Sequence, residues 1–157
     1  MRKVFSVIGA ILVAVTLISC IKEKVEDIKI IGDINIKEDL GDIKVTIEKS
    51  NKFCKDEIDS AIEIVKKEFK NFKGCKLTDL LYEEDYSNEV SVGYIENGNG
   101  SVNGVKAENI IVLKSNFDVG AEGGDGSLNP NSTYEDWNWI LIRDSKTSSW
   151  NLDDWEY

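Results

Sequence analysis

The side chains best placed for acid–base chemistry in this 157-residue sequence are carboxylates. The chain has 29 Asp and Glu residues against 19 Lys and Arg residues, a formal net charge of −10, and no histidine. The missing histidine excludes Ser-His-Asp and Cys-His nucleophile systems, histidine-ligated zinc and haem, and the commonest general base. The surplus of negative charge argues against a nucleic-acid partner, because proteins that bind nucleic acids neutralise phosphates with a basic face.

Two runs of acids, residues 83–85 and Asp153-Asp154, would act as a general acid and base only if they were buried close together. Neighbouring residues of a strand point to opposite faces, so Asp153 and Asp154 cannot form one dyad. We therefore expect solvated acids in both runs and assign no catalytic residue.

Tryptophans and an arginine share one face of a strand expected near the C-terminus. Alternation over residues 137–143 places four side chains on that face: Trp137, Trp139, Leu141 and Arg143. These residues suit a cleft for an apolar anion, which the guanidinium would orient. The alternative is that the aromatic side chains are core and that Arg143 pairs with an acid such as Asp144 or Asp153.

A glycine-rich segment, residues 118–133, is the longest stretch without periodicity, and its acids and amides are oxygen donors suited to calcium. Counted from Asp125, however, Pro130 stands where an EF-hand requires glycine. A loop that caps itself is the favoured interpretation, and we expect no metal and no cofactor. Asp125 joins Trp137, Trp139 and Arg143 as a candidate ligand-binding residue.

The N-terminus resembles a bacterial lipoprotein signal peptide. A basic start is followed by the apolar segment 4–18, which is shorter than the about 20 residues of a membrane-spanning helix and ends in Leu17-Ile18-Ser19-Cys20. The resemblance implies that residues 1–19 are removed and that Cys20 receives a diacylglyceryl group, since two acyl chains anchor a protein stably. The mature chain would carry 17 basic and 29 acidic residues, so anionic headgroups would repel it. We expect a lipid-anchored protein on the extracytoplasmic face of the cell membrane.

Residues 20–52 repeat a short apolar–polar alternation of isoleucines that is punctuated by Gly32 and Gly41. Such alternation is typical of strands. The segment is therefore either a set of accessory strands or a lipidated tether, and both interpretations stay open.

A single α+β domain is expected over residues 53–157. Apolar residues spaced three and four apart predict a helix over 56–72, with Gly74 as its stop. Strand-like segments follow at 76–83, 91–96, 109–118, 134–143 and 149–156, and the Asn-Gly pairs of 97–104 predict a hairpin turn between the second and third of them. The fold class is an N-terminal helix packed on a curved, mainly antiparallel sheet.

Cys54 and Cys75 bracket the expected helix, which would be about 25 Å long. A disulfide needs Cα atoms within about 7 Å of each other. A bridge between these two cysteines is therefore not expected, and free or buried thiols fit the sequence better.

Five segments of residues 53–157 form a distinctive ordered set: Phe69 to Thr78, Asn97 to Val105, Gly123 to Tyr134, Trp137 to Asp144 and Trp150 to Tyr157. Together they resemble a family of uncharacterised clostridial and bacillar lipoproteins. The resemblance implies a Gram-positive surface lipoprotein and brings no known activity. The family usually ends Asp-Trp-Gly-Tyr, whereas this chain has Glu156 in place of the glycine.

The layout of tryptophan-rich strands at the C-terminus is also similar to the cone-shaped fold of ketosteroid-isomerase-like and nuclear-transport-factor-like proteins. Two functions are consistent with the sequence. One is a non-catalytic module that binds a small ligand or an extracytoplasmic protein partner. The alternative is a small cone-fold isomerase or hydrolase with one buried carboxylate as base, and an acid with a raised pKa in an apolar pocket would favour that enzyme.

Overall fold

The computed structural model describes residues 36–40 and 43–156 and is built around one six-stranded sheet. The strands lie in chain order, β1-β2-β3-β4-β5-β6, and every neighbouring pair is antiparallel except β2 and β3, which are parallel. The elements are β1 (Ile36–Leu40), β2 (Ile43–Ile47), α2 (Lys55–Phe69), β3 (Cys75–Tyr82), α3 (Glu84–Asn97), α4 (Gly100–Asn103), the 3₁₀ turn η2 (Ala107–Asn109), β4 (Ile110–Val119), β5 (Thr133–Ile142) and β6 (Asn151–Glu156). The expected α+β class, a helix on a curved and mainly antiparallel sheet, is confirmed.

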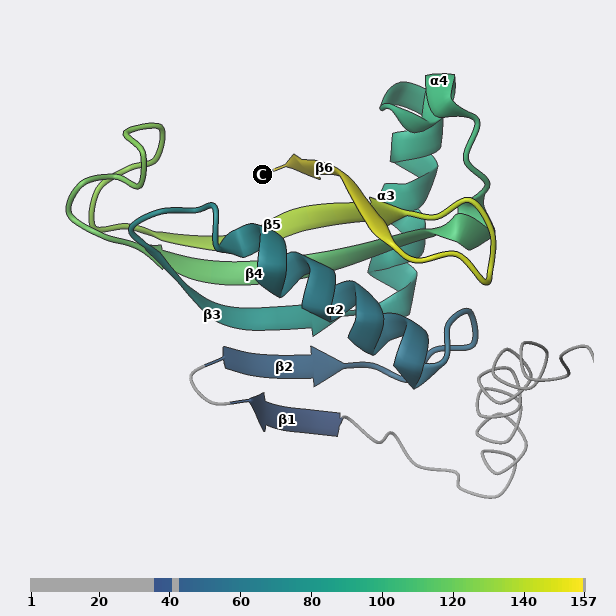
Figure 1. Cartoon of the computed structure of the whole chain (residues 1–157), viewed down its shortest axis with the longest axis horizontal. Helices are drawn as coiled ribbons and strands as arrows, with labels where there is room; N and C mark the ends of the chain where they lie inside the picture. Colours follow the sequence, from purple (N-terminus) through teal and green to yellow (C-terminus); the bar gives the residue numbers. More distant parts are fainter. Residues whose placement is uncertain (1–35, 41–42, 157) are drawn as a thin grey trace, which may run out of the picture.

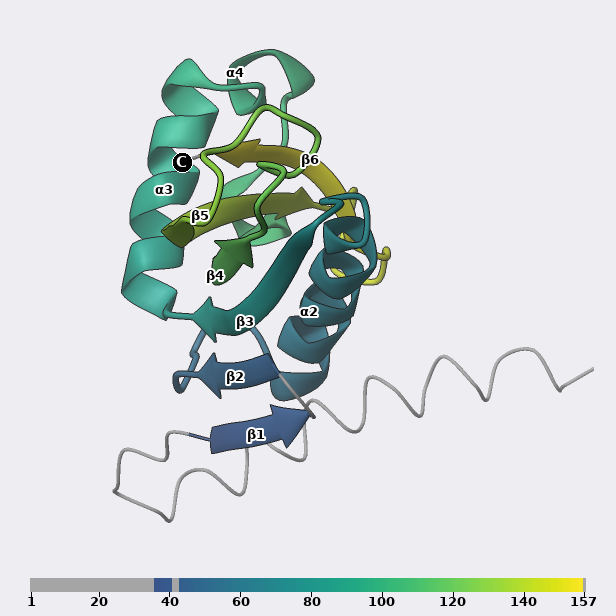
Figure 2. The same ribbon diagram turned by 90° about the vertical axis from the view of Figure 1, so that its left-hand side faces the viewer.

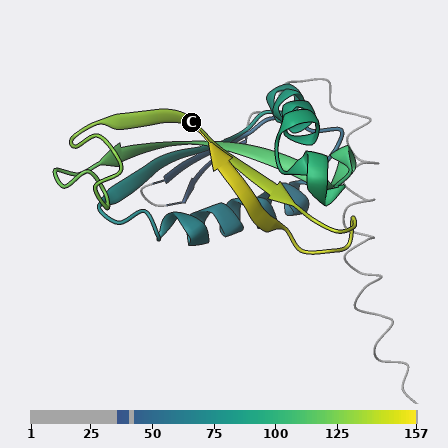
Figure 3. The ribbon, with the colours of Figure 1, turned by 90° about the horizontal axis from the view of Figure 1, so that it is seen from above.

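The two long helices cover opposite faces of the sheet (Figures 1, 2 and 3). Because side chains alternate along a strand, β4 contributes to both layers. Ile111 and Leu113 belong to the core beneath α2, whereas Ile110 and Val112 pack with Tyr94 of α3. All four β4 residues are at most 1% exposed, so this strand is buried on both sides.

Helix α2 forms where the apolar spacing predicts it. Its buried residues are Ile58, Ala61, Ile62, Val65 and Phe69. The backbone N–H of Cys54 donates to Glu57 Oε2 at 2.8 Å, which satisfies one of the donors left open at the helix start. The helix ends at Phe69, three residues before the expected end, and Gly74 (φ +72°) then turns the chain into β3.

The expected strand over 91–96 is wrong, because these residues lie in α3. The sequence pattern concealed this helix, since the face that it buries contains small polar residues: Ser87 is 0% exposed and Ser91 is 1% exposed. Ser91 donates its hydroxyl proton to the Ser87 carbonyl at 2.6 Å, and the Val112 backbone N–H donates to Ser87 Oγ at 2.9 Å. The serine hydroxyl therefore provides β4 with an acceptor from the helix.

The hairpin turn expected over 97–104 is also wrong. The Asn-Gly segment instead ends α3 and forms the short helix α4, whose C-cap is Gly104 (φ +71°). Gly100 lies against the Tyr94 ring, so closely that a Cβ atom there would be 2.8 Å from two ring carbons. Gly104 therefore ends α4, and Gly100 allows the backbone to approach the Tyr94 ring. The strand that follows is β4.

Residues 36–40 and 43–47 are strands of the sheet, which is the accessory-strand interpretation of this part of the 20–52 segment. Val45 and Ile47 are 2% and 6% exposed and belong to the same core as α2. The ordered sheet therefore begins before residue 53. Residues 1–35, including the signal-peptide and Cys20 predictions, lie outside the described residues.

The other four strand predictions are confirmed to within two residues at either end by β3, β4, β5 and β6. Cys75 has a free thiol at the start of β3, so no disulfide joins it to Cys54, as the length of the helix predicts. Cys54 is buried at the start of α2 and does not carry a free thiol, so the expectation of a free thiol holds for Cys75 but not for Cys54.

The role of β2 in the core can be tested by substitution in the full chain. Val45→Asp should lower the free energy of unfolding by several kcal/mol, because it buries a charge without a partner. Lys49→Asp, at an exposed position after the strand, should change it by no more than about 0.5 kcal/mol. Denaturant unfolding measures both values, and equal effects of the two variants would show that β2 is not a core strand.

Candidate functional site

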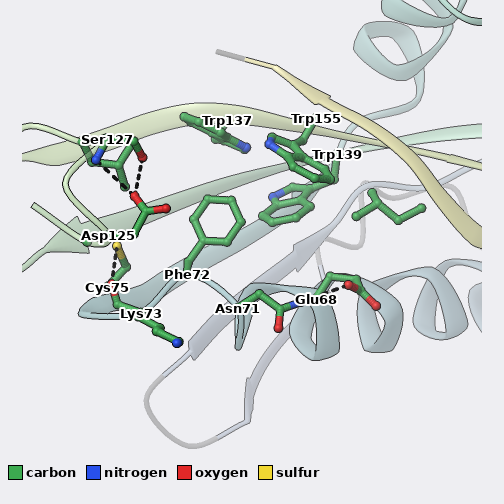
Figure 4. Close-up of a pocket in the computed structure, with 13 residues that line it drawn as sticks. Glu68, Asn71, Phe72, Lys73, Cys75, Asp125, Ser127, Trp137, Trp139 and Trp155 are labelled. Atoms are coloured by element: carbon green, nitrogen blue, oxygen red, sulfur yellow. Dashed lines mark hydrogen bonds between the residues drawn. The ribbon is translucent and has the colours of Figure 1, made fainter.

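An aromatic pocket of about 290 Å³ opens between the end of α2, the β4–β5 loop and strands β5 and β6 (Figure 4). Its apolar lining comes from Phe72, Leu128, Trp137, Trp139, Leu152 and Trp155. Its polar and small residues are Glu68, Asn71, Lys73, Cys75, Gly124, Asp125 and Ser127. The structure thus brings together three of the four candidate ligand-binding residues: Trp137, Trp139 and Asp125.

The aromatic rings meet at steep angles. Phe72 and Trp137 have centroids 5.8 Å apart with ring planes at 89°, and Phe72 and Trp139 are 5.3 Å apart at 54°. Trp155, which is 50% exposed, lies 6.4 Å from Trp139 at 40°. Rings at these distances and angles pack directly against one another, so they form one continuous aromatic wall.

Strand alternation explains why both tryptophans of β5 reach the pocket. Trp137, Trp139 and Leu141 all pack in the core beneath α2, as the sequence predicts. Asn138 lies on the opposite face, where its Oδ1 accepts a hydrogen bond from Tyr86 of α3 at 2.9 Å. The predicted division of this strand into two faces is confirmed.

The glycine-rich loop forms the third wall and largely caps itself. The Gly120 N–H donates to the Gly74 carbonyl at 2.9 Å, and the Leu128 and Asn131 N–H groups donate to Gly123 and Gly120 at 3.2 Å each. Gly124 adopts φ +68°, and a Cβ atom at this position would lie 3.4 Å from Leu128 and 3.6 Å from the Cys75 sulfur. Glycine therefore allows the loop to close over the start of β3.

Asp125 places an ionised carboxylate at the rim. Its Oδ1 accepts hydrogen bonds from the Ser127 hydroxyl at 2.6 Å and from the Ser127 N–H at 3.1 Å. These hydrogen bonds, with a smaller contribution from the charge of Lys73, hold the pKa of Asp125 below its ordinary value. Burial and the Asp125 charge raise the pKa of Cys75, so the thiol beside the pocket is a weak nucleophile.

Arg143, the fourth candidate residue, lies at the other end of α2. Its Nη1 atom is 2.9 Å from Glu57 Oε1, and its guanidinium lies 4.2 Å from the Trp150 ring centroid. Glu57 and Glu68 are 11 residues apart on the helix, which separates them by about 16 Å. The guanidinium therefore forms an ion pair in the core, and its partner is Glu57 and not Asp144 or Asp153. It brings no positive charge to the aromatic pocket.

The two acid runs have separate partners, so the expectation of solvated acids holds only in part. Asp153 accepts hydrogen bonds from Tyr94 and from Asn99, and burial together with the Asp153 bond raises the pKa of the Tyr94 phenol. Glu83 pairs with Lys114 at 2.6 Å. Asp85 is exposed.

Glu84 is a structural acceptor for the segment that enters α2. Its carboxylate accepts hydrogen bonds from the Ser50 hydroxyl and from the Asn51 and Lys52 N–H groups. Burial alone would raise the pKa of Glu84, but these hydrogen bonds outweigh it and lower the pKa. The acids of 83–85 and 153–154 thus position secondary structure and do not converge on one reacting atom.

Within residues 36–40 and 43–156, no three Asp, Glu or Cys side chains come close enough together to hold a metal ion. In the same part of the chain, no helix combines the length and the apolar character that crossing a membrane requires. The lining of the pocket presents aromatic faces, the carboxylates of Glu68 and Asp125, the ammonium group of Lys73 and several neutral polar groups.

Residues 37–155 match a family that is described as a domain of unknown function, DUF4829. The chain belongs to this family. No curated protein and no solved structure is significantly similar to it, so the likeness to the cone fold stays a prediction. The family match runs from within β1 to within β6 and includes every residue that lines the pocket.

Sequence reasoning missed Phe72, Trp155, Leu128 and Leu152 as pocket residues. Phe72 is the last residue of the predicted helix 56–72, and it does stack on Phe69 at 5.1 Å, but it lies beyond the observed helix end and contacts Trp137. Trp155 reaches the site because β6 pairs it with Trp139. That pairing register is a tertiary property, and no local motif encodes it.

The structural role of Arg143 leads to a stability prediction. Arg143→Ala should lower the free energy of unfolding by about 3–5 kcal/mol, because it leaves the carboxylate of Glu57 without its partner in the core. Trp155→Ala should cost much less, since half of that side chain is already in water. Chemical denaturation measures both changes, and a full-length Arg143→Ala protein of unchanged stability would contradict the ion-pair role.

Proposed function

We propose that this protein is a non-catalytic binding module, anchored by lipid to the extracytoplasmic face of the membrane, and that it takes a small ligand in the aromatic pocket. The observation that carries this proposal is the pocket itself, an apolar recess with a few polar groups at its rim. Binding sites for small molecules have this composition. Aromatic walls contribute much contact area with little loss of side-chain freedom.

The ionisation of Asp125 favours binding over the enzyme alternative. An isomerase or hydrolase with a single carboxylate base would need an acid whose pKa is raised by an apolar environment. Asp125 is exposed, and its hydrogen bonds shift its pKa in the opposite direction. The second hypothesis is a small cone-fold isomerase or hydrolase, and it is supported only by the layout of the C-terminal strands.

The anchoring part of the proposal rests on the N-terminal sequence. A basic start, an apolar core of signal-peptide length and the ending Leu-Ile-Ser-Cys occur together. The net charge supports a domain that faces away from the membrane surface, since the strongly acidic mature chain is repelled by anionic headgroups. The family match adds membership of an uncharacterised family and does not bear on the anchor.

Ligand binding can be measured with N-phenyl-1-naphthylamine, a neutral fluorophore that brightens in apolar surroundings. We expect saturable binding to the full chain, with energy transfer from tryptophan because three tryptophans line the pocket. Trp155→Ala should weaken binding several-fold, since it removes one wall at an exposed position. The control Val102→Ala changes an 85% exposed side chain outside the pocket and should leave binding unchanged. Unsaturable binding, or equal affinity of the two variants, would refute the binding site.

Lipid anchoring can be measured by fractionation and mass spectrometry of the protein from cells. Cys20→Ala should move the protein out of the membrane fraction or leave it unprocessed, because the thiol that receives the diacylglyceryl group is gone. Cys75→Ala is the matched control, and it should stay lipidated and membrane-bound. A wild-type mature protein whose Cys20 is unacylated, or is engaged in a disulfide, would overturn the anchoring proposal.

A further inference from the structure

The charges at the rim of the aromatic pocket indicate which class of ligand it takes, and this inference rests on the proposed binding function. Two carboxylates, Glu68 and Asp125, line the pocket against one ammonium group, Lys73. The whole chain is acidic as well, with a net charge of −10. The local and the overall potential therefore favour a positively charged ligand.

The aromatic walls favour the same sign of charge. The face of an indole or phenyl ring carries partial negative charge and attracts a cation, most strongly for tryptophan and where water is excluded. Phe72 and Trp137 stand at 89° to each other, and Trp139 and Trp155 at 40°. Figure 4 shows Phe72, Trp137 and Trp155 around one space, with Trp139 behind it, so a bound group can contact more than one ring.

The positive charges of Arg143 and Lys73 oppose this preference only in part. Arg143, the one arginine among the described residues, is 5% exposed and paired with Glu57 at the far end of α2. Lys73 is exposed, and its charge acts on Asp125. In Figure 4 its side chain runs along the lower edge of the pocket, while the Asp125 carboxylate lies beside Phe72.

We propose that the aromatic pocket binds the ammonium group of a small organic cation that also carries an apolar body. The rings of Phe72, Trp137 and Trp155 border the ammonium group, and Asp125 is its counter-ion. Leu128 and Leu152 contact the apolar part. Cation–π attraction requires no N–H group on the ligand, so a quaternary ammonium group suits the pocket.

The test compares ligands that differ only in charge, by tryptophan fluorescence of the full-length protein. The probes are benzyltrimethylammonium, its neutral isostere neopentylbenzene and the anion benzylsulfonate. We expect the cation to bind at least about tenfold more tightly than the neutral isostere, as a desolvated cation–π contact allows. The anion should bind most weakly. Equal affinity of the cation and the isostere, or preference for the anion, would overturn the proposal.

The counter-ion can be identified by comparing a variant that removes a negative charge with one that removes a positive charge. Asp125→Asn should weaken binding of benzyltrimethylammonium several-fold and leave neopentylbenzene unchanged, whereas Lys73→Gln should tighten binding of the cation. Asp144→Asn makes the same substitution at an exposed position beyond the other end of β5 and should change neither ligand. A cation affinity that is unchanged in Asp125→Asn would overturn the role of Asp125.

Two conditions add readouts that a purely structural effect would not produce. The pKa of Asp125 is depressed, so its carboxylate stays charged at neutral and mildly acidic pH, and cation binding should be lost only as the pH falls through that low pKa. Binding of the neutral isostere should not follow this titration. Added salt should weaken binding of the cation alone.

The outcomes separate this inference from the proposed function. If N-phenyl-1-naphthylamine binds in the pocket but the cation has no advantage over its isostere, the charge preference is wrong and the binding module stands. If neither N-phenyl-1-naphthylamine nor any charged probe binds, the binding function itself is refuted.

Discussion

Burial of β4 on both faces is the constraint on which the rest of the structure depends. Four consecutive residues, Ile110 to Leu113, are almost fully excluded from water, and they alternate between the two helix layers. Burial of apolar surface is the largest favourable contribution to folding. An antiparallel sheet with one solvated face would leave half of these side chains in water, so the second helix is a requirement of the strand.

The two layers meet this requirement with different chemistry. Under α2 the contact is a broad aromatic and aliphatic core, in which Phe69 lies against Phe117 and Trp139. Under α3 the helix approaches with small serines, and Ser87 accepts the Val112 N–H beyond the end of the β3 pairing. A buried backbone donor without an acceptor would cost about 1–3 kcal/mol. The polar face of α3 therefore completes the hydrogen bonding of the strand that its apolar residues cover.

The two ends of α2 have become different environments. At its N-terminal end, Glu57 joins Arg143 and also accepts the Trp150 indole N–H through its backbone carbonyl at 2.9 Å, which ties the helix to the segment before β6. At its C-terminal end, the chain leaves the helix at Phe69 and turns back at Gly74, so that the β4–β5 loop closes against it. The ion pair holds the N-terminal end of α2 in the core, whereas the C-terminal end borders the aromatic pocket. The position of the aromatic pocket follows from this asymmetry.

Local sequence determined the elements whose patterns are strong. The apolar spacing of three and four in α2 and the alternation of Trp137, Trp139 and Leu141 in β5 are properties of short segments, and both faces were predicted. The same rules failed for α3, because Ser87 and Ser91 on its buried face remove the apolar signal and because alternation around Val92 imitates a strand. The Asn-Gly pairs that follow are compatible with a hairpin or with a helix end, and only the packing of Gly100 on Tyr94 decides between them.

Only part of the aromatic pocket could be predicted from the sequence. Strand alternation brings Trp137 and Trp139 together, but Phe72, Trp155 and the loop at Asp125 meet them through strand register and loop closure. Sequence spacing likewise placed Arg143 on the face of the tryptophans, and tertiary structure decided its partner, because a buried guanidinium needs a carboxylate and the first turn of α2 supplies Glu57.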